Sequence, residues 1–251
     1  IGPRSRGRKL ITVDKIFYSL LTSKVQEEGD DDQHLPRLTP QDTGEIFLTR
    51  AYKRDDYEMQ PQSYKDRMTK LSVIQGSTPH YINTYIAGVF KAYHTTELSK
   101  GKPTHFQQKL KAMKIKAASM TKAELAISHI DYIGDQPFYI PIRYERSGRM
   151  HAMSYPISYQ GDEDYKALIT LGDGQLEANE DDIIYTMENE LGHSPETLET
   201  ILTNSEMIYN DPLSEEALEI YGDNGKPCFT TLKLLQQLHI AREEHTHETH
   251  D

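Results

Sequence analysis

The side chains best suited to chemistry in this sequence surround the dipeptide Ser147-Gly148. Arg146 and Arg149 lie on either side of it. A guanidinium group binds phosphate through parallel hydrogen bonds, so two of them at one bend indicate contact with a phosphate backbone. A surface hairpin that merely carries an arginine at its turn is the alternative interpretation.

The residues around this bend predict a β-hairpin. The strand before the bend has one apolar face, because apolar side chains occupy alternate positions: Phe138, Ile140, Ile142 and Tyr144. Ser147-Gly148 supplies a turn, and Met150 to Tyr155 is the return strand.

A short helix is predicted after a second break at Gln160-Gly161. Asp162 caps its start, Lys166 lies on it, and Gly172 follows its end. The local sequence therefore predicts a hairpin, a turn and a helix, with guanidinium groups at the bend.

This order of motifs resembles the start of the palm domain in the single-subunit, T seven-like RNA polymerases of bacteriophages and mitochondria. That family has an acid-x-x-Gly-Arg motif, an aromatic residue two positions later, a Gln-Gly turn, and a Lys that opens a Gly/Ala-Leu-Leu-Thr-Leu helix. Here the matching segments are Glu145 to Ser154, Gln160-Gly161 and Lys166 to Leu171. The resemblance covers about Gln136 to Ile240 and is strongest from Phe138 to Leu171.

The resemblance implies a role for each matching residue. The family's Gly-Arg motif holds the template strand and the RNA–DNA hybrid, which assigns this role to Arg149, with Glu145 at the acidic position. Ser147 replaces the family's middle Arg, for which Arg146 can substitute, and a histidine replaces the aromatic residue. The residues expected to bind nucleic acid at the hairpin are Arg149, Arg146, Gly148, His151 and Lys166.

The charges of the 251-residue chain are unevenly spread around a net charge of −11. From Glu177 to Asp223 there are fourteen acids and no Lys or Arg, whereas from Lys100 to Lys122 there are seven Lys and no acid. Either run can be a solvated helix face. Because like charges repel, we expect the Lys-rich run to contact phosphate, through Lys109, Lys111, Lys114 and Lys116.

Composition excludes several classes of protein. The single cysteine, Cys228, excludes a disulfide framework and fits a reducing cytoplasm. There is no secretory signal pattern, and no run approaches the ~18 apolar residues of a membrane span. No Ser/His/Asp arrangement, Walker loop or Rossmann fingerprint occurs. We expect a protein without membrane contact, and the resemblance implies the cytoplasm of an infected bacterial host.

The expected fold is a helix-rich α+β chain that forms the thumb and the N-terminal part of the palm of a right-hand polymerase, completed by a partner chain. Three regions are expected: an N-terminal helical region (1–61), a thumb-like helical region with the basic stretch (62–133), and the N-terminal part of the palm (134–251). Within the first region, Thr12 opens a helix, Gln26 to Pro40 is a linker, Leu35 to Arg54 contains a second helix, and Asp55 to Pro61 ends it.

Further helices are predicted from caps and apolar periodicity. One begins at Ser77-Thr78-Pro79, where a cap precedes a proline. Thr104 to Lys116 forms the next, and Thr121 to Ile133 fits a helix or a strand, of which the resemblance favours the helix. After Gly172 the predicted helices are Asp181 to Leu191, Pro195 to Tyr209, Pro212 to Tyr221 and Pro227 to about Arg242.

The aspartates that nucleotidyl transfer requires are missing. In the family two palm aspartates hold two Mg²⁺ ions, and a fingers helix carries a Lys and a Tyr. The resemblance implies a fragment, or the smaller subunit of a split, heterodimeric DNA-directed RNA polymerase like the two-chain enzymes of N four-type podophages. We expect no catalytic or metal-binding residue here, no activity in the isolated chain, Mg²⁺ on a larger catalytic subunit, and a separate promoter-recruiting factor.

Two rival interpretations remain. One is a metal-dependent hydrolase, because the histidines near the end of the sequence can bind zinc or nickel. That segment lacks an apolar shell to fix ligand geometry, so a solvated tail is the favoured explanation for these residues: His239, His245, His247 and His250. The charge segregation by itself also fits a non-enzymatic nucleic-acid-binding or assembly protein.

Overall fold

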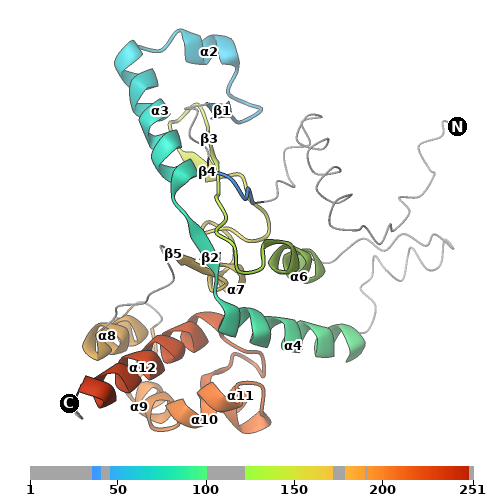
Figure 1. Ribbon diagram of the computed structural model, residues 1–251, viewed down its shortest axis with the longest axis vertical. Coiled ribbons are helices and arrows are strands. Elements are labelled where there is room, and N and C mark those ends of the chain that lie inside the picture. The colour runs from blue at the N-terminus through green and yellow to red at the C-terminus, as the bar shows by residue number, and fades with distance from the viewer. Residues whose placement is uncertain (1–35, 41–45, 101–121, 172–178, 190–191, 249–251) are drawn as a thin grey trace, which may run out of the picture.

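The computed structural model describes residues 36–40, 46–100, 122–171, 179–189 and 192–248 (Figure 1). Helices predominate there, and the strands form one three-stranded and one two-stranded sheet. The predicted helix-rich α+β class is therefore confirmed. No helix in this part of the chain is long and apolar enough to cross a membrane. The helices predicted from Thr12 and over Thr104 to Lys116 lie outside the described residues, and the three-region division stays a prediction.

The predicted hairpin is present and supplies two strands of the three-stranded sheet, with β3 at its centre and β4 at its edge. Strand β3 (Ile142–Tyr144) pairs antiparallel with β4 (Met150–Ala152), and β1 (Phe47–Leu48) pairs parallel with β3. All four alternating apolar residues of the predicted strand are buried: Phe138, Ile140, Ile142 and Tyr144. The return strand is shorter than predicted, because it ends at Ala152.

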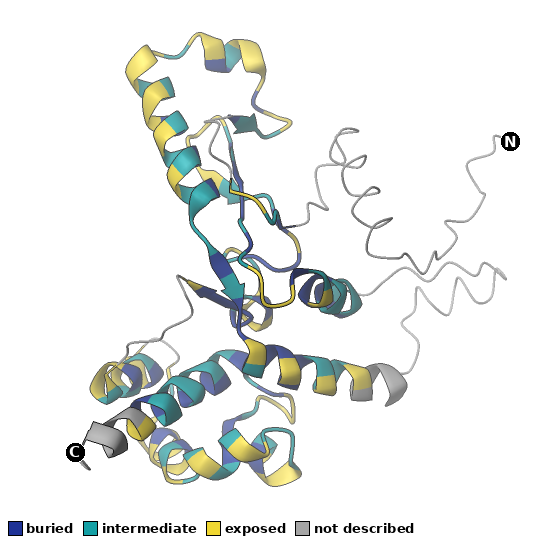
Figure 2. Cartoon of the chain, viewed as in Figure 1, coloured by how far each residue is buried: buried dark blue, intermediate teal, exposed yellow. Residues whose placement is uncertain are grey.

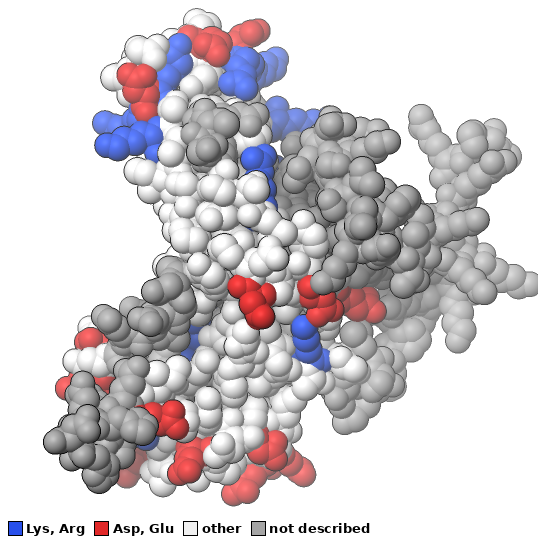
Figure 3. Space-filling view, in the orientation of Figure 1, with Lys and Arg blue, Asp and Glu red and all other residues white. Residues whose placement is uncertain are grey.

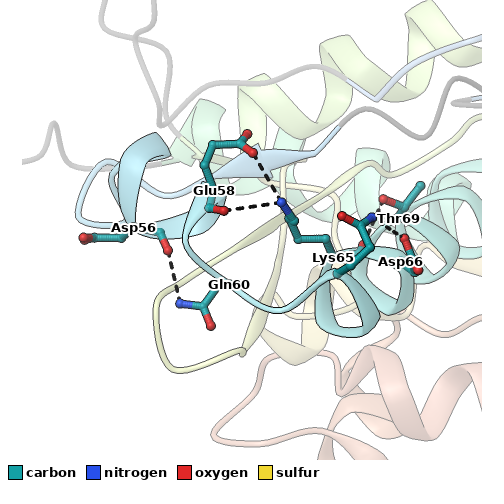
Figure 4. Close-up of polar contacts among 7 residues, drawn as sticks. Asp56, Glu58, Gln60, Lys65, Asp66 and Thr69 are labelled. Atoms are coloured by element: carbon teal, nitrogen blue, oxygen red, sulfur yellow. Dashed lines mark hydrogen bonds and ion pairs between the residues drawn. The ribbon is translucent and has the colours of Figure 1, made fainter.

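Two helices cover this sheet. They are α2 (Arg54–Glu58) and α3 (Gln62–Ser77), and Figure 1 shows α3 running alongside β1, β3 and β4. A small hydrophobic core joins them: Ile46, Tyr52, Tyr57, Met68, Ile142 and Tyr144. The corner between the helices is fixed by Lys65, whose Nζ lies 3.3 Å from the carbonyl oxygen and 3.5 Å from Oε2 of Glu58 (Figure 4).

The helix predicted within Leu35 to Arg54 is absent from the described part of that range. Phe47–Leu48 is instead a strand, and Arg37 exchanges backbone hydrogen bonds of 3.0 and 2.7 Å with Tyr139. Pairing with a strand distant in sequence thus overrides the local apolar pattern. The predicted break from Asp55 to Pro61 is also wrong, because most of α2 lies within it.

The prediction of a helix beginning at Ser77-Thr78-Pro79 is wrong. Helix α3 ends at Ser77, and the chain then forms strand β2 (His80–Ile82). The next helix, α4 (Thr84–Lys100), begins only after Asn83, whose Oδ1 accepts a hydrogen bond of 3.0 Å from the Ile86 backbone N–H. The N-cap of this helix is therefore Asn83, several residues after the cap predicted at Ser77-Thr78.

The short helix after Asp162 is also different from the prediction. Helix α7 (Glu163–Lys166) has a single turn, and Ile169–Leu171 forms strand β5 rather than continuing the helix. Strand β5 pairs antiparallel with β2, with Ile169 opposite Ile82. Residues 169–171 are extended and not helical because β2 supplies hydrogen-bond partners for their backbone.

A larger core lies among the remaining helices. The described part of the range predicted from Thr121 to Ile133 is a helix, α6 (Lys122–Ile133). The helices that follow are α8 (Glu180–Asn189), α9 (Pro195–Thr203), α10 (Ser205–Asn210), α11 (Glu215–Tyr221) and α12 (Phe229–Glu248). Helix α12 packs against α4, α7, α8 and α10. Figure 2 shows buried residues where these helices face one another and exposed residues on their outer sides.

Three of the helices predicted in this part differ from those in the structure. The helix predicted over Pro195 to Tyr209 is two helices, because Asn204 has a non-helical backbone (φ −101°, ψ 12°). The helix predicted from Pro212 starts at Glu215, after the N-cap Ser214. Helix α12 begins at Phe229 and continues past Arg242 to Glu248.

Charge is segregated between the two ends of the molecule. Among the described residues, 179–189 and 192–225 contain many acids but no Lys or Arg, and they form α8 to α11. Most Lys and Arg side chains visible in Figure 3 gather at the opposite end, around α2 and α3, where some acids also lie. The hairpin therefore belongs to the less acidic end.

Candidate nucleic-acid interface

The bend of the hairpin is a tight, hydrogen-bonded turn. The backbone N–H of Gly148 donates to the Glu145 carbonyl oxygen (2.9 Å), and the N–H of Glu145 donates to the Arg149 carbonyl oxygen (3.0 Å). Gly148 has φ 83°, a left-handed conformation that residues with a side chain avoid. A Cβ there would also lie 3.4 Å from the Tyr64 hydroxyl on α3. The structure thus gives Gly148 a role in shaping the turn.

Three side chains of the hairpin converge on the Glu145 carboxylate, and two of them, His151 and Arg149, belong to the predicted site. Ser147 Oγ donates a hydrogen bond to it, His151 Nε2 lies 3.3 Å from Oε2, and Arg149 Nε lies 3.6 Å from Oε1. The Ser147 hydrogen bond, followed by the His151 and Arg149 contacts, lowers the pKa of Glu145. The carboxylate therefore stays ionised near neutral pH and orients the base of the Arg149 guanidinium.

Arg149 itself projects into solvent. Its side chain is 81% exposed although its Nε faces Glu145. Its other guanidinium nitrogens can therefore donate to a ligand. Arg146 is also exposed at the turn, and no ion pair of Arg146 occurs among the described residues. Two cations at one fixed bend suit an extended anion such as a nucleic-acid backbone.

The Gln160-Gly161 motif has a structural explanation. Gln160 Nε2 donates to the Met150 carbonyl oxygen (2.9 Å), and its Oε1 accepts from the Ala152 backbone N–H (2.7 Å). The side-chain amide thereby covers the outer edge of β4 in the way a further strand would. A Cβ at Gly161 would lie 3.2 Å from the Ser158 carbonyl oxygen, so a larger residue there would require the neighbouring backbone to shift by a few tenths of an ångström.

The other predicted site residues lie apart from this cluster or beyond the described part of the chain. Lys166 is on α7, and its Nζ pairs with Glu163 Oε1 at 2.6 Å. It does not join the Glu145 cluster. The predicted contacts from the Lys-rich run fall outside the described residues: Lys109, Lys111, Lys114 and Lys116.

Sequence reasoning missed an open groove of about 360 Å³ beside β4. His151 lies in its wall, together with Arg143, Tyr155 and Lys122. Arg143 is directly opposite His151 in the β3–β4 ladder. The sequence does contain one indication of this groove, the charged residue Arg143 between Ile142 and Tyr144. Because side chains alternate between the two faces of a strand, Arg143 lies on the face away from the core.

The histidines near the end of the sequence give no metal site within the described part of the chain. His239 stacks on Tyr209 with ring centroids 4.0 Å apart, and its Nε2 lies 3.4 Å from Glu243 Oε1. No group of three or more His, Cys, Asp or Glu suited to a metal ion occurs among the described residues. The side chains of His245, His247 and His250 are not among them.

Comparisons with known proteins add no assignment. No known protein family matches this chain. A comparison with curated proteins likewise finds no match. The arguments for function consequently rest on the residues and their geometry.

Proposed function

We propose that this chain is the nucleic-acid-holding, smaller subunit of a two-chain DNA-directed RNA polymerase of the phage single-subunit type. The observation that carries the proposal is the geometry of Arg149, which is 81% exposed while its Nε lies 3.6 Å from Glu145. A guanidinium that is oriented at its base and open at its tip suits contact with a template or hybrid phosphate.

The surroundings of the hairpin support this role. The strand before the bend is buried against α3, and the Gln160 amide covers the outer strand. A contact that must hold a moving strand in register requires such a rigid support, because conformational freedom at the contact would weaken it. The hairpin and the Gln-Gly turn also follow the order of motifs in the polymerase family, whereas Lys166 ends α7 instead of opening a helix and Ile169–Leu171 is a strand.

The remaining functions belong to other chains in this proposal. The palm aspartates, the two Mg²⁺ ions and the fingers helix would be on the larger catalytic subunit. Promoter choice would depend on a recruiting factor, and the enzyme would transcribe phage genes in the cytoplasm of the infected bacterium. The isolated chain would bind nucleic acid but make no RNA.

The decisive experiment measures RNA synthesis on single-stranded DNA with Mg²⁺ and four nucleotides. The chain is assayed alone and with the larger protein that co-purifies with it. RNA synthesis by the pair, with none by the isolated chain, supports the split polymerase. An intact pair without activity that still binds DNA indicates the alternative, a non-enzymatic nucleic-acid-binding or assembly protein, and RNA synthesis by the isolated chain contradicts the proposal.

The role of Arg149 is tested by Arg149→Ala in the same pair. We expect weaker binding of the RNA–DNA hybrid and a slope of log affinity against log salt that is smaller by about 0.7–0.9. Arg242→Ala is the matched control. Arg242 is also exposed and also pairs with a glutamate at 2.7 Å, but that glutamate, Glu180, lies on the acidic helix α8. Normal hybrid binding by Arg149→Ala combined with lower stability would make its role structural.

A further inference from the structure

The groove beside β4 contains an exposed aromatic ring. Tyr155 is 42% exposed and lines the groove, and Lys122 Nζ lies 5.2 Å from its ring centroid. Tyrosine rings that are partly open to solvent serve as stacking platforms for unpaired bases, because every base has a flat π face. A nearby cation adds attraction for the phosphate that follows the stacked base.

Basic side chains line this groove from three elements, α6, β3 and β4. Lys122 begins α6, and its Nζ is held over a second ring, Tyr165, at 4.3 Å. Arg143 and His151 come from adjacent positions of β3 and β4. The groove therefore joins the hairpin to the helix that follows the Lys-rich run, two basic features that are far apart in the sequence.

Carboxylates oppose two of these basic side chains. Glu145 Oε2 lies 3.3 Å from His151 Nε2. Asp162 lines the groove and pairs with Lys122. The Asp162 side chain is 72% exposed, whereas that of Lys122 is only 28% exposed. An anionic ligand would compete with this carboxylate for the ammonium group, so the pair weakens phosphate binding without blocking the groove.

The size of the groove limits what it can hold. Its volume of about 360 Å³ lies near the lower end of the ~300–1,000 Å³ of small-molecule sites. This is enough for a base with its sugar and phosphate and too little for a duplex. The ligand class that combines a flat base with a phosphate is a nucleotide within a single strand.

We propose that this groove binds one nucleotide of single-stranded nucleic acid, with its base stacked on Tyr155 and its phosphate held by Lys122, Arg143 and His151. The inference rests on the proposed function, because the strand would continue from the Arg149 contact past His151 into the groove. It adds to that function a stacking site for an unpaired base.

The first test is photochemical. The full chain is irradiated with an oligothymidylate that carries one iodouracil, a probe that cross-links efficiently to a stacked aromatic ring, and the cross-linked peptide is identified by mass spectrometry. We expect cross-linking at Tyr155 and its loss in Tyr155→Ala. Cross-links at other residues, with none at Tyr155, would overturn the proposal.

The second test measures the affinity of the same oligonucleotide by fluorescence anisotropy. Tyr155→Ala should weaken binding about 5- to 150-fold, whereas Tyr155→Phe keeps the ring and should bind normally. Tyr185→Ala is the matched control, because Tyr185 is 64% exposed on the acidic helix α8. Equal binding by wild type and Tyr155→Ala would overturn the stacking role.

The phosphate contact is tested with two exposed ion pairs. Lys122→Gln should lower the salt slope by about 0.7, whereas Lys91→Gln should leave it unchanged, although Lys91 also pairs with an aspartate, Asp131, at 2.6 Å. Asp162→Asn should tighten binding, because it frees Lys122. No gain from Asp162→Asn together with an unchanged slope for Lys122→Gln would contradict the phosphate contact.

The tests separate this inference from the proposed function. If Arg149→Ala weakens hybrid binding while Tyr155→Ala has no effect, the hairpin contact stands and the groove proposal fails. If Tyr155→Ala acts but the purified pair makes no RNA, the groove binds single strands in a protein that is not a polymerase subunit.

Discussion

The Tyr144 hydroxyl donates a hydrogen bond of 2.8 Å to the Met68 carbonyl oxygen, and this contact joins the hairpin to α3. Both residues are buried. The Ser72 hydroxyl lies 3.5 Å from the same phenol oxygen. The strand that leads to Arg149 is thereby attached to a helix residue 76 positions earlier in the sequence. The rigidity of the bend depends on that attachment.

Tyr144→Phe should lower the free energy of unfolding by about 0.5–1.5 kcal/mol, because the Met68 carbonyl oxygen loses its buried partner while the ring remains. Urea unfolding measures the change. Tyr185→Phe, on an exposed ring, should have no effect. An unchanged midpoint for Tyr144→Phe would show that this hydrogen bond does not fasten the hairpin to α3.

Two glycine substitutions should change the stability of the chain in opposite directions. Gly148→Ala should destabilise the chain by about 1–2 kcal/mol, because Gly148 has φ 83° and its added Cβ would meet Tyr64. Gly88→Ala should stabilise it by about 0.5–1 kcal/mol, because Gly88 lies within α4 and nothing lies within 4 Å of an added Cβ. Thermal unfolding compares them, and a stabilising Gly148→Ala would contradict the turn geometry.

The Gln160 amide should protect the edge of β4 from solvent exchange. Gln160→Ala removes the acceptor of the Ala152 N–H, so that amide should exchange with solvent faster, with a local loss of about 0.5–1.5 kcal/mol. NMR hydrogen exchange measures it. Gln62→Ala is the control, since the Gln62 side chain donates to the exposed Asp66 side chain and not to a strand edge. Equal exchange at Ala152 in wild type and Gln160→Ala would exclude the edge-covering role.

Acid should destabilise the chain through His129. Burial lowers the pKa of His129 from 6.5 to about 4, so the folded state holds the neutral ring. The unfolded state therefore binds the proton first as pH falls. The stabilisation is complete above about pH 6.5 and is lost progressively toward pH 4, by about 1.4 kcal/mol for each unit of pKa depression.

Urea unfolding at several pH values should show this slope, and His129→Gln should reduce it. NMR titration of the His129 ring in the wild-type chain provides an independent measurement that does not depend on the variant folding. A ring that titrates near pH 6.5 in the folded state would contradict the prediction.

The sequence by itself determined the features that depend on neighbouring residues. Alternate apolar positions predicted the buried strand through Tyr144, and the glycine at position 148 predicted the turn. The predicted helix start at Pro195 is the first residue of α9, and the preceding Ser194 hydroxyl accepts a hydrogen bond of 3.2 Å from the Thr197 N–H. Each of these signals depends on only a few neighbouring residues, so it can be recognised in the sequence without knowledge of the rest of the chain.

The tertiary structure alone decided the features that depend on distant partners. His80–Ile82 and Ile169–Leu171 both occur in runs that were predicted as helix, and each is a strand because the other supplies its hydrogen-bond partners. The groove has the same origin, since Lys122, Arg143 and Tyr155 come from separate elements that only packing brings together. Contacts between residues far apart in the chain leave no local pattern from which they can be predicted.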